Sequence, residues 1–178
     1  MDGRAGPILG WRAWRISTSR DGLRLRSAVF DDAWEPGAEF VGSCTDGGHA
    51  VPCEACACGV HAARDPSEAA RYLVGRDDPD VVHRVVGLVT LTGRVVEHER
   101  GWRAERGMPR RLWVPAADTN GETAPAAGVV VGLGAYGVRV DLVPAFAPTA
   151  VAAAVDASWH TRHGRVSHVC GLQRYARA

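Results

Sequence analysis

The sequence predicts an α+β fold, in which a small, bent antiparallel β-sheet or barrel carries two helices and one long loop. Segments with alternating bulky and small residues recur along the first two thirds of the chain, as half-buried strands require. Two short stretches carry helix-start signals. Ahead of both, four of the five cysteines crowd into one segment rich in glycine. Such clustered thiols indicate a loop stapled by a metal ion.

The length and composition of the chain set its organisation. A chain of 178 residues suits one domain with a modest appendage and can bury a real core. We expect residues 10–115 to form a metal-binding β-rich domain. Residues 116–127 are small and polar and predict a linker or long loop. Residues 128–178 would then form a C-terminal α/β extension packed on that domain.

Charge and hydropathy narrow the classes of partner and compartment. The net charge of +1 gives no electrostatic reason to expect nucleic acid or an anionic membrane as the partner. No run of about 18 apolar residues is present, so no membrane span is expected. The chain also begins without the pattern of a secretory signal. An odd, clustered cysteine count disfavours a disulfide framework, so we expect a cytoplasmic protein.

Residues 11–28 predict a two-stranded hairpin. Bulky and small residues alternate on both sides of Asp21-Gly22, a dipeptide typical of tight hairpin turns. Leu23 and Leu25 are expected to face the core, with the arginines between and beyond them facing solvent.

A helix is predicted to begin after Asp65. This residue is a favourable N-cap, Pro66 suits the first helical position, and Glu68 completes a capping box. The helix should end at Gly75, because glycine commonly follows the last helical turn.

Residues 82–114 predict two long strands separated by a turn at Arg100-Gly101. The first, over 82–99, contains Gly87 and Gly93, which suggest bulges or sharp bends. The segments Gly10-Trp-Arg-Ala-Trp-Arg15 and Gly101-Trp-Arg-Ala-Glu-Arg106 nearly repeat each other. Their shared pattern suggests two similar strands side by side in one sheet.

The C-terminal third is less clearly patterned. Residues 129–133 fit a strand or a helical turn, and residues 136–142 predict a short strand. A second helix is expected over 150–160, with Val151 and Val155 on one face.

The cysteine-rich segment runs from Cys44 to His61, and a short strand over 38–43 should lead into it. Zinc binds thiolate and imidazole tetrahedrally, and these side chains must converge on one point. The favoured set, C-x4-H-x6-C-x-C in spacing, consists of Cys44, His49, Cys56 and Cys58. Four protein ligands leave no position for water, which indicates a structural zinc site.

Other ligand sets remain open from the sequence. Cys53 could replace His49, and His61 is an alternate ligand. The four cysteines of the segment could instead hold an iron–sulfur cluster.

The same segments resemble a group of small, uncharacterised actinobacterial and phage proteins. The resemblance rests on Cys44…His49-Ala-Val-Pro52…Cys56-Ala-Cys58-Gly59-Val-His-Ala62, followed by Gly93-Arg-Val-Val-Glu-His98-Glu-Arg-Gly101-Trp-Arg-Ala-Glu105. The group's pattern is C…H-x-A-P…C-x-C-G-[I/L]-Y-A and then G-x-V-V-x-H-x-x-G-[W/Y/F]-R-A-E. It covers roughly residues 10–115 and implies the Cys44, His49, Cys56 and Cys58 ligand set. His61 departs from it, standing where the pattern has tyrosine. The group carries no established activity.

These observations favour a non-enzymatic, zinc-stabilised binding or regulatory module whose partner is a protein or a small ligand. The first alternative is a small zinc-dependent enzyme with an open site, in which His98 or Glu97 serves as the base. The second is a nucleic-acid binder, less favoured because the chain has no basic excess. It would use the tryptophans and arginines that alternate on two strands, namely Trp11, Trp14, Trp102, Arg12, Arg15 and Arg103.

Overall fold

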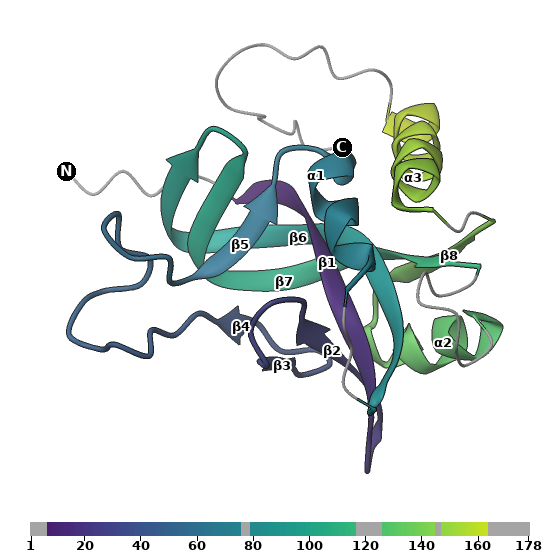
Figure 1. The fold of residues 1–178 in the computed structure, drawn as a ribbon, viewed down its shortest axis with the longest axis horizontal. Helices are drawn as coiled ribbons and strands as arrows, with labels where there is room; N and C mark the ends of the chain where they lie inside the picture. The colour runs from purple at the N-terminus through teal and green to yellow at the C-terminus, as the bar shows by residue number, and fades with distance from the viewer. Residues whose placement is uncertain (1–6, 76–78, 117–125, 145–146, 164–178) are drawn as a thin grey trace.

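The computed structural model describes residues 7–75, 79–116, 126–144 and 147–163 (Figure 1). Within these residues, eight strands form one sheet: β1 (Ile8–Ser19), β2 (Gly22–Ser27), β3 (Ala33–Trp34), β4 (Phe40–Val41), β5 (Val60–Ala63), β6 (Val81–His98), β7 (Gly101–Pro115) and β8 (Arg139–Val143). Three α-helices accompany them: α1 (Pro66–Ala70), α2 (Ala126–Gly132) and α3 (Pro148–His163). Short 3-10 turns follow the first two helices, η1 (Arg71–Leu73) and η2 (Leu133–Tyr136). The predicted α+β class is confirmed at this level.

Four strands are joined by hydrogen bonds into a ring. β1 pairs with β6, β6 with β7, and β7 with β5, all antiparallel. β5 returns to β1 through the pairing of Ala63 with Trp11. Figure 1 shows β5 crossing over the long strands β6 and β7. The ring places β5, and the loop that precedes it, against both β1 and β7.

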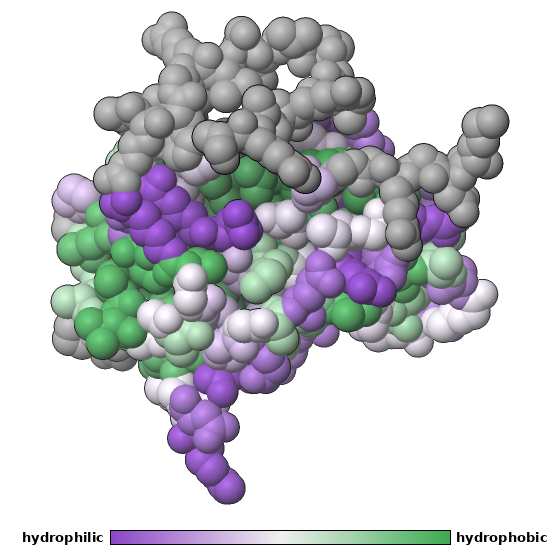
Figure 2. Space-filling view, turned by 180° about the vertical axis from the view of Figure 1, so that it is seen from behind, coloured by the Kyte–Doolittle hydropathy of each residue, from purple (hydrophilic) through white to green (hydrophobic). Residues whose placement is uncertain are grey.

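The predicted hairpin over 11–28 is confirmed as β1 and β2. Its strands pair from Trp14 with Ser27 to Ser19 with Gly22. Gly22 has φ of +113°, a backbone region that glycine enters without steric cost. The tip of the hairpin projects from the body of the molecule and is hydrophilic (Figure 2).

The two glycines predicted to bend the long strand meet different structural requirements. Gly93 has φ of +77° and lies in an irregular part of the β6–β7 pairing, as expected for a bulge. Gly87 pairs regularly with both β1 and β7, and the register shift comes one residue later. A Cβ on Gly87 would lie 2.3 Å from the carbonyl oxygen of Arg111, so this position requires close approach of two strands rather than a bend.

The C-terminal half corrects two expectations. The sheet is mixed rather than wholly antiparallel, because β8 pairs in parallel with β7. Residues 129–133 are helical, which makes α2 a third helix between two parallel strands, the usual way to connect such a pair. The predicted strand over 136–142 is present in its second half as β8, which begins at Arg139, whereas Tyr136 belongs to η2. Residues 117–125 of the predicted linker lie outside the described residues, and its last two residues belong to α2.

Two hydrophobic clusters form the core. One is centred on Trp14, Trp34 and Leu25, which are fully buried. The other packs α1 and α3 against the sheet, with Trp11 and Trp113 of the strands at its centre. Figure 1 shows α1 and α3 on one side of the strands and α2 on the other.

Both predicted helices are present. The side chain of Asp65 accepts a hydrogen bond of 3.0 Å from the backbone amide of Glu68, which confirms the predicted N-cap. α1 passes into η1 and ends at Leu73. On α3, Val151 and Val155 are both buried against the sheet, as expected. No helix among the described residues has the length and apolar character needed to cross a membrane.

Candidate metal centre

The cysteine-rich loop connects β4 to β5, and its two ends meet on β7. The amide of Gly42 donates a hydrogen bond of 2.7 Å to the carbonyl oxygen of Glu105. A Cβ on Gly42 would lie 3.0 Å from the Cα of Gly59. Gly59 itself has φ of +107°, and a Cβ there would lie 2.9 Å from the Ala104 carbonyl oxygen. Glycine at both ends therefore lets the loop close tightly over the strand.

Four side chains of this loop converge: Cys44, His49, Cys56 and Cys58. Their ligand atoms all lie within 4.8 Å of one another. The Cys44 and Cys56 sulfurs are 3.6 Å apart, and the Cys58 sulfur lies 3.4 Å from Nε2 of His49. Tetrahedral coordination with ordinary zinc bond lengths would give about 3.8 Å between two sulfurs and about 3.6 Å between sulfur and nitrogen. The four groups therefore lie close enough to hold a metal ion.

The two alternate ligands lie elsewhere. Cys53 is outside the converging group, and its carbonyl oxygen accepts a hydrogen bond of 3.2 Å from the Cys56 amide. The Nε2–H of His61 donates to the carbonyl oxygen of Ala57 at 2.7 Å. The backbone of Cys53 thus shapes the turn between two ligands, while the ring of His61 holds the start of β5 against the loop.

The paired thiols Cys44 and Cys56 differ in acidity. Burial acts to raise the pKa of Cys44, but the amide of Asp46, with other hydrogen bonds, lowers it below its ordinary value. For Cys56, the amide of Cys58 acts to lower the pKa, yet the Cys44 side chain and burial raise it to about 11. Without a cation, the pair therefore retains a proton that metal binding would release.

The side chain of Arg103, on β7, hydrogen-bonds to the backbone of the cysteine-rich loop. Its side chain is buried, and Nη1 donates to the carbonyl oxygens of Cys53 at 3.0 Å, Cys58 at 3.2 Å and Cys56. Its Nε donates to Nε2 of His98 at 2.8 Å. One guanidinium thus binds three backbone carbonyls of the segment that carries two of the ligands.

From the sequence, Arg103 is predicted only as a candidate contact to nucleic acid. The signal that could have identified its role is the near repeat of Gly-Trp-Arg-Ala. Arg12, the matching arginine of the first copy, donates from Nη1 to the carbonyl oxygen of His61 at 2.5 Å. The two arginines therefore reach the same chain segment, one from β1 and one from β7.

The repeated segments flank β5 instead of lying side by side. In the sheet, Ala63 of β5 pairs with Trp11 on one side and Gly101 on the other. A Cβ on Gly10 would lie 2.6 Å from the Cβ of Ala62, and one on Gly101 would lie 2.0 Å from the Ala62 carbonyl oxygen. Each repeat therefore begins with glycine because β5 approaches closely there.

The tryptophans of these strands are mostly unavailable for stacking with a partner. Trp11 and Trp14 are buried, with exposed fractions of 7% and 0%. Trp102 is half-buried, and the guanidinium of Arg64 lies 4.7 Å from its ring centroid. This arrangement is that of a core whose edge is covered by arginines.

His98 and Glu97, the candidate bases, lie outside the cysteine–histidine group. Glu97 accepts a hydrogen bond of 2.5 Å from Nη2 of Arg64. Nε2 of His98 accepts from Arg103, so its lone pair is engaged. Arg103 stands between this imidazole and the loop that carries the ligands.

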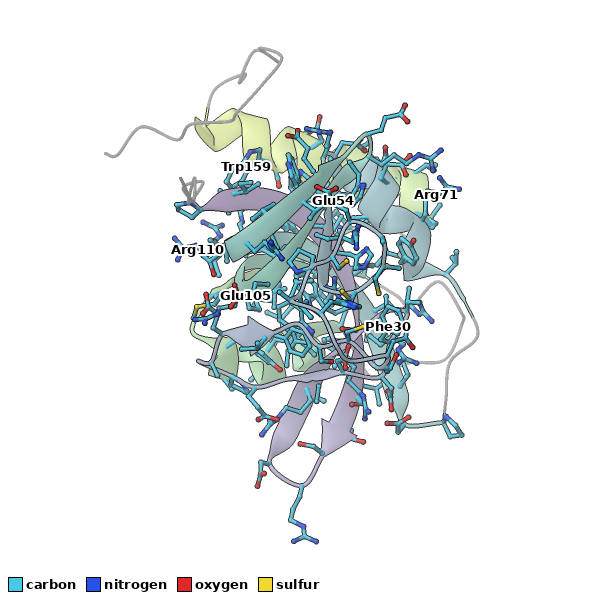
Figure 3. All side chains as sticks on the ribbon, turned by 90° about the vertical axis from the view of Figure 1, so that its left-hand side faces the viewer. Phe30, Glu54, Arg71, Glu105, Arg110 and Trp159 are labelled. Atoms are coloured by element: carbon cyan, nitrogen blue, oxygen red, sulfur yellow. The ribbon has the colours of Figure 1, made fainter. Side chains whose placement is uncertain are left out.

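A cleft of about 1030 Å³ opens beside the loop. Its lining includes residues 54–57 of the loop, part of α1 and the segment after β2. Arg12, His61, His98 and Arg103 also line it. Figure 3 looks onto this side of the molecule, where Phe30, Glu54 and Arg71 are labelled. The loop that could bind a metal is therefore also part of a cavity wall.

The fold and the site define an α+β protein with a cluster of three cysteines and one histidine that could hold a metal ion. No protein-family model, curated protein or solved structure matches the chain significantly. Any functional conclusion therefore depends on the geometry of the site.

Proposed function

We propose that this chain is a non-enzymatic binding module in which Cys44, His49, Cys56 and Cys58 hold a structural zinc ion. The observation that carries the proposal is the convergence of four ligand atoms from one loop that also walls the cleft. A structural ion fixes such a loop, and its binding energy contributes directly to folding. The ion would thus maintain a surface for a protein or small-ligand partner.

The donor set favours zinc over an iron–sulfur cluster. Three thiolates and one imidazole are a usual set for structural zinc, whereas ordinary clusters of two or four irons use four thiolates. The fourth thiol of the segment, Cys53, lies outside the converging group. The four described cysteines are all free, so the proposal places the protein in a reducing compartment such as the cytoplasm.

A structural role fits the surroundings better than a catalytic one. Four protein ligands complete the coordination of zinc and leave no position for a reactive water. The nearest candidate base, His98, has its Nε2 engaged by Arg103. Glu97 is paired with Arg64 on the surface. The proposal therefore assigns no general base to the metal ion.

Metal content separates the favoured ligand set from its rivals. We expect one zinc per chain in the purified wild-type protein and in Cys53→Ser, measured by elemental analysis after gel filtration. Cys56→Ser should contain far less zinc, because it removes one of the four converging donors. The two variants make the same chemical change three residues apart. Full zinc in Cys56→Ser together with loss in Cys53→Ser would refute the assigned set, and iron would refute the proposed ion.

Arg103 is expected to support metal binding through the loop backbone. Arg103→Met removes the donors to three loop carbonyls while keeping an apolar stem. Changes in groups that orient metal ligands typically weaken metal affinity by about 10–100-fold, and we expect that range in a chelator competition assay. Arg106→Met, three residues along β7 and paired on the surface with Glu105, should leave the affinity within about twofold of wild type. Equal loss in both variants would contradict this role.

A further inference from the structure

Two guanidinium groups and two imidazoles line the cleft: Arg12, Arg103, His61 and His98. Arg103 is hydrogen-bonded to three carbonyls and to His98, and no carboxylate among the described residues forms an ion pair with it. Arg12 likewise bonds to neutral groups, the His61 carbonyl and the Ser27 hydroxyl. Both guanidinium groups thus line the cleft without a direct ion pair among the described residues, although the nearby carboxylate of Asp32 acts on Arg12.

Arg12 is held in one position by its surroundings. Its Nη2 donates to the Ser27 hydroxyl at 2.9 Å, and its guanidinium carbon lies 5.1 Å from the ring centroid of Trp34. Its Nε is buried and has no hydrogen-bond partner among the described residues. A cation fixed in this way can bind an anion without first losing much side-chain entropy.

The pKa values of two groups in the cleft are lowered, and that of His61 reflects burial together with positive charge beside it. Burial lowers the pKa of Arg12 to about 10, although Asp32 acts in the opposite direction. Burial also lowers the pKa of His61, and the charges of Arg12, Arg103 and His98 lower it further despite the Ala57 carbonyl. The lowered pKa of Arg12 thus reports its desolvation, and that of His61 reports desolvation together with the positive charge beside it.

Exposed aromatic side chains also line the cleft. Phe30 and Tyr72, which line it, are 54% and 51% exposed. Three acids also line the cleft, Asp32, Glu54 and Glu68, of which Glu68 is engaged by Arg71 and Arg100. A ligand that matched both sets of side chains would carry a negative group for the arginines and a ring for the aromatic side chains. The volume of about 1030 Å³ is ample for a small organic molecule.

We propose that the cleft binds a small organic oxyanion, a carboxylate or a phosphate attached to an aromatic ring. The oxyanion binds beside Arg12 and Arg103, and the ring packs against Phe30 and Tyr72. The inference rests on the proposed function, because the metal-binding loop forms one wall of the cleft. Binding of this anion is non-covalent and requires no general base.

Titration of the full-length, zinc-loaded protein tests this site. Phenyl phosphate and benzoate are added separately and followed by calorimetry, with inorganic phosphate as the probe that lacks a ring. We expect at least one ring-bearing anion to bind at least tenfold more tightly than inorganic phosphate. The comparison of phenyl phosphate with benzoate distinguishes a phosphate site from a carboxylate site. Absence of binding by both ring-bearing anions to zinc-loaded protein would overturn the inference and leave the structural zinc site standing.

Paired variants locate the binding. Arg12→Gln should lower the affinity for the anion by about 10–100-fold, the range expected for a lost charge-assisted hydrogen bond. Phe30→Ala changes an exposed side chain. It should lower the affinity for the ring-bearing anion and leave the affinity for inorganic phosphate unchanged. Arg110→Gln and Val131→Ala are the matched controls, both exposed and away from the cleft.

Two outcomes separate the possible failures. If Arg12 only supports packing, Arg12→Gln lowers the melting temperature, Phe30→Ala binds like wild type, and the inference is wrong. Zinc content is measured on every sample. Binding that depends on Arg12 and Phe30 in a protein found to contain no zinc would support the anion site and refute the structural metal.

Discussion

Removal of the ion by a chelator is expected to lower the melting temperature of the wild-type chain by about 8–16 °C. A ligand that binds only the folded state stabilises it by about 4 kcal/mol when its free concentration is about 1,000 times its Kd. For a chain of this size, each kcal/mol corresponds to about 2–4 °C. The physical cause is local, since the four donors lie in one loop that the ion holds closed.

The serine variants provide the controls for this measurement. Cys53→Ser should respond to the chelator like wild type, because Cys53 is outside the ligand group. Cys56→Ser should melt at a lower temperature and change little on chelation. The melting curve is recorded by circular dichroism, with the zinc content known for each sample. An equal response of Cys56→Ser and wild type to the chelator would contradict a structural ion bound by this set.

The substitution Gly101→Ala is expected to destabilise the fold by about 3 kcal/mol, the upper part of the range for overpacked positions. A Cβ there would lie 2.0 Å from the carbonyl oxygen of Ala62 and 2.9 Å from the Cα of Ala63. Both are backbone atoms of β5, so no rotamer change can relieve the clash. β5 would have to move away from β7, which would strain its pairing with β1 as well.

Gly128→Ala is the matched control. Gly128 lies in α2, and a Cβ there would meet no atom of the described residues within 4 Å. Alanine is the better helix former by about 1 kcal/mol, so this variant should be unchanged or slightly more stable. Urea denaturation measures both variants. Comparable destabilisation of the two, or none at Gly101, would show that the close approach of β5 and β7 is not required.

Local signals in the sequence predicted the parts of the fold that local chemistry determines. The Asp21-Gly22 turn and the Asp65-Pro66 helix start each act over a few residues, and both are present in the structure. The strand β5 was not predicted, because Val60–Ala63 is short and directly follows the cysteines. Its pairing with two strands is set by residues about 40 or 50 positions away, which a sequence pattern does not reveal.

The C-terminal differences have a similar cause. The run of three valines within α2 has the composition of a strand, and intrinsic preference is easily overridden by tertiary packing. Val129 is fully buried against the core, which rewards the helical arrangement. Residues 129–133 fitted either a strand or a helical turn, so the sequence did not indicate a helix between β7 and β8 or their parallel pairing.

The ligand residues of the candidate site could be predicted from the sequence, but the arginine that binds the loop backbone could not. The favoured set of Cys44, His49, Cys56 and Cys58 came from spacing within 15 residues, and the structure brings these groups together. Arg103, which binds the carbonyls beneath them, is 45 residues beyond Cys58. Local spacing does not link Arg103 to the ligand residues. The repeated Gly-Trp-Arg-Ala segment is the one sequence feature that points to its role.

The pairing of β7 also bears on how chains of this fold can change in length during evolution. β7 is hydrogen-bonded to β4, β5, β6 and β8. An insertion or deletion of one residue within it would shift its register against several partners at once and turn the following side chains to the opposite face. Among the described residues, the tip of the β1–β2 hairpin pairs with no strand outside the hairpin, and it projects into solvent (Figure 2). Length variation should therefore accumulate at that tip, while β7 keeps a constant number of residues.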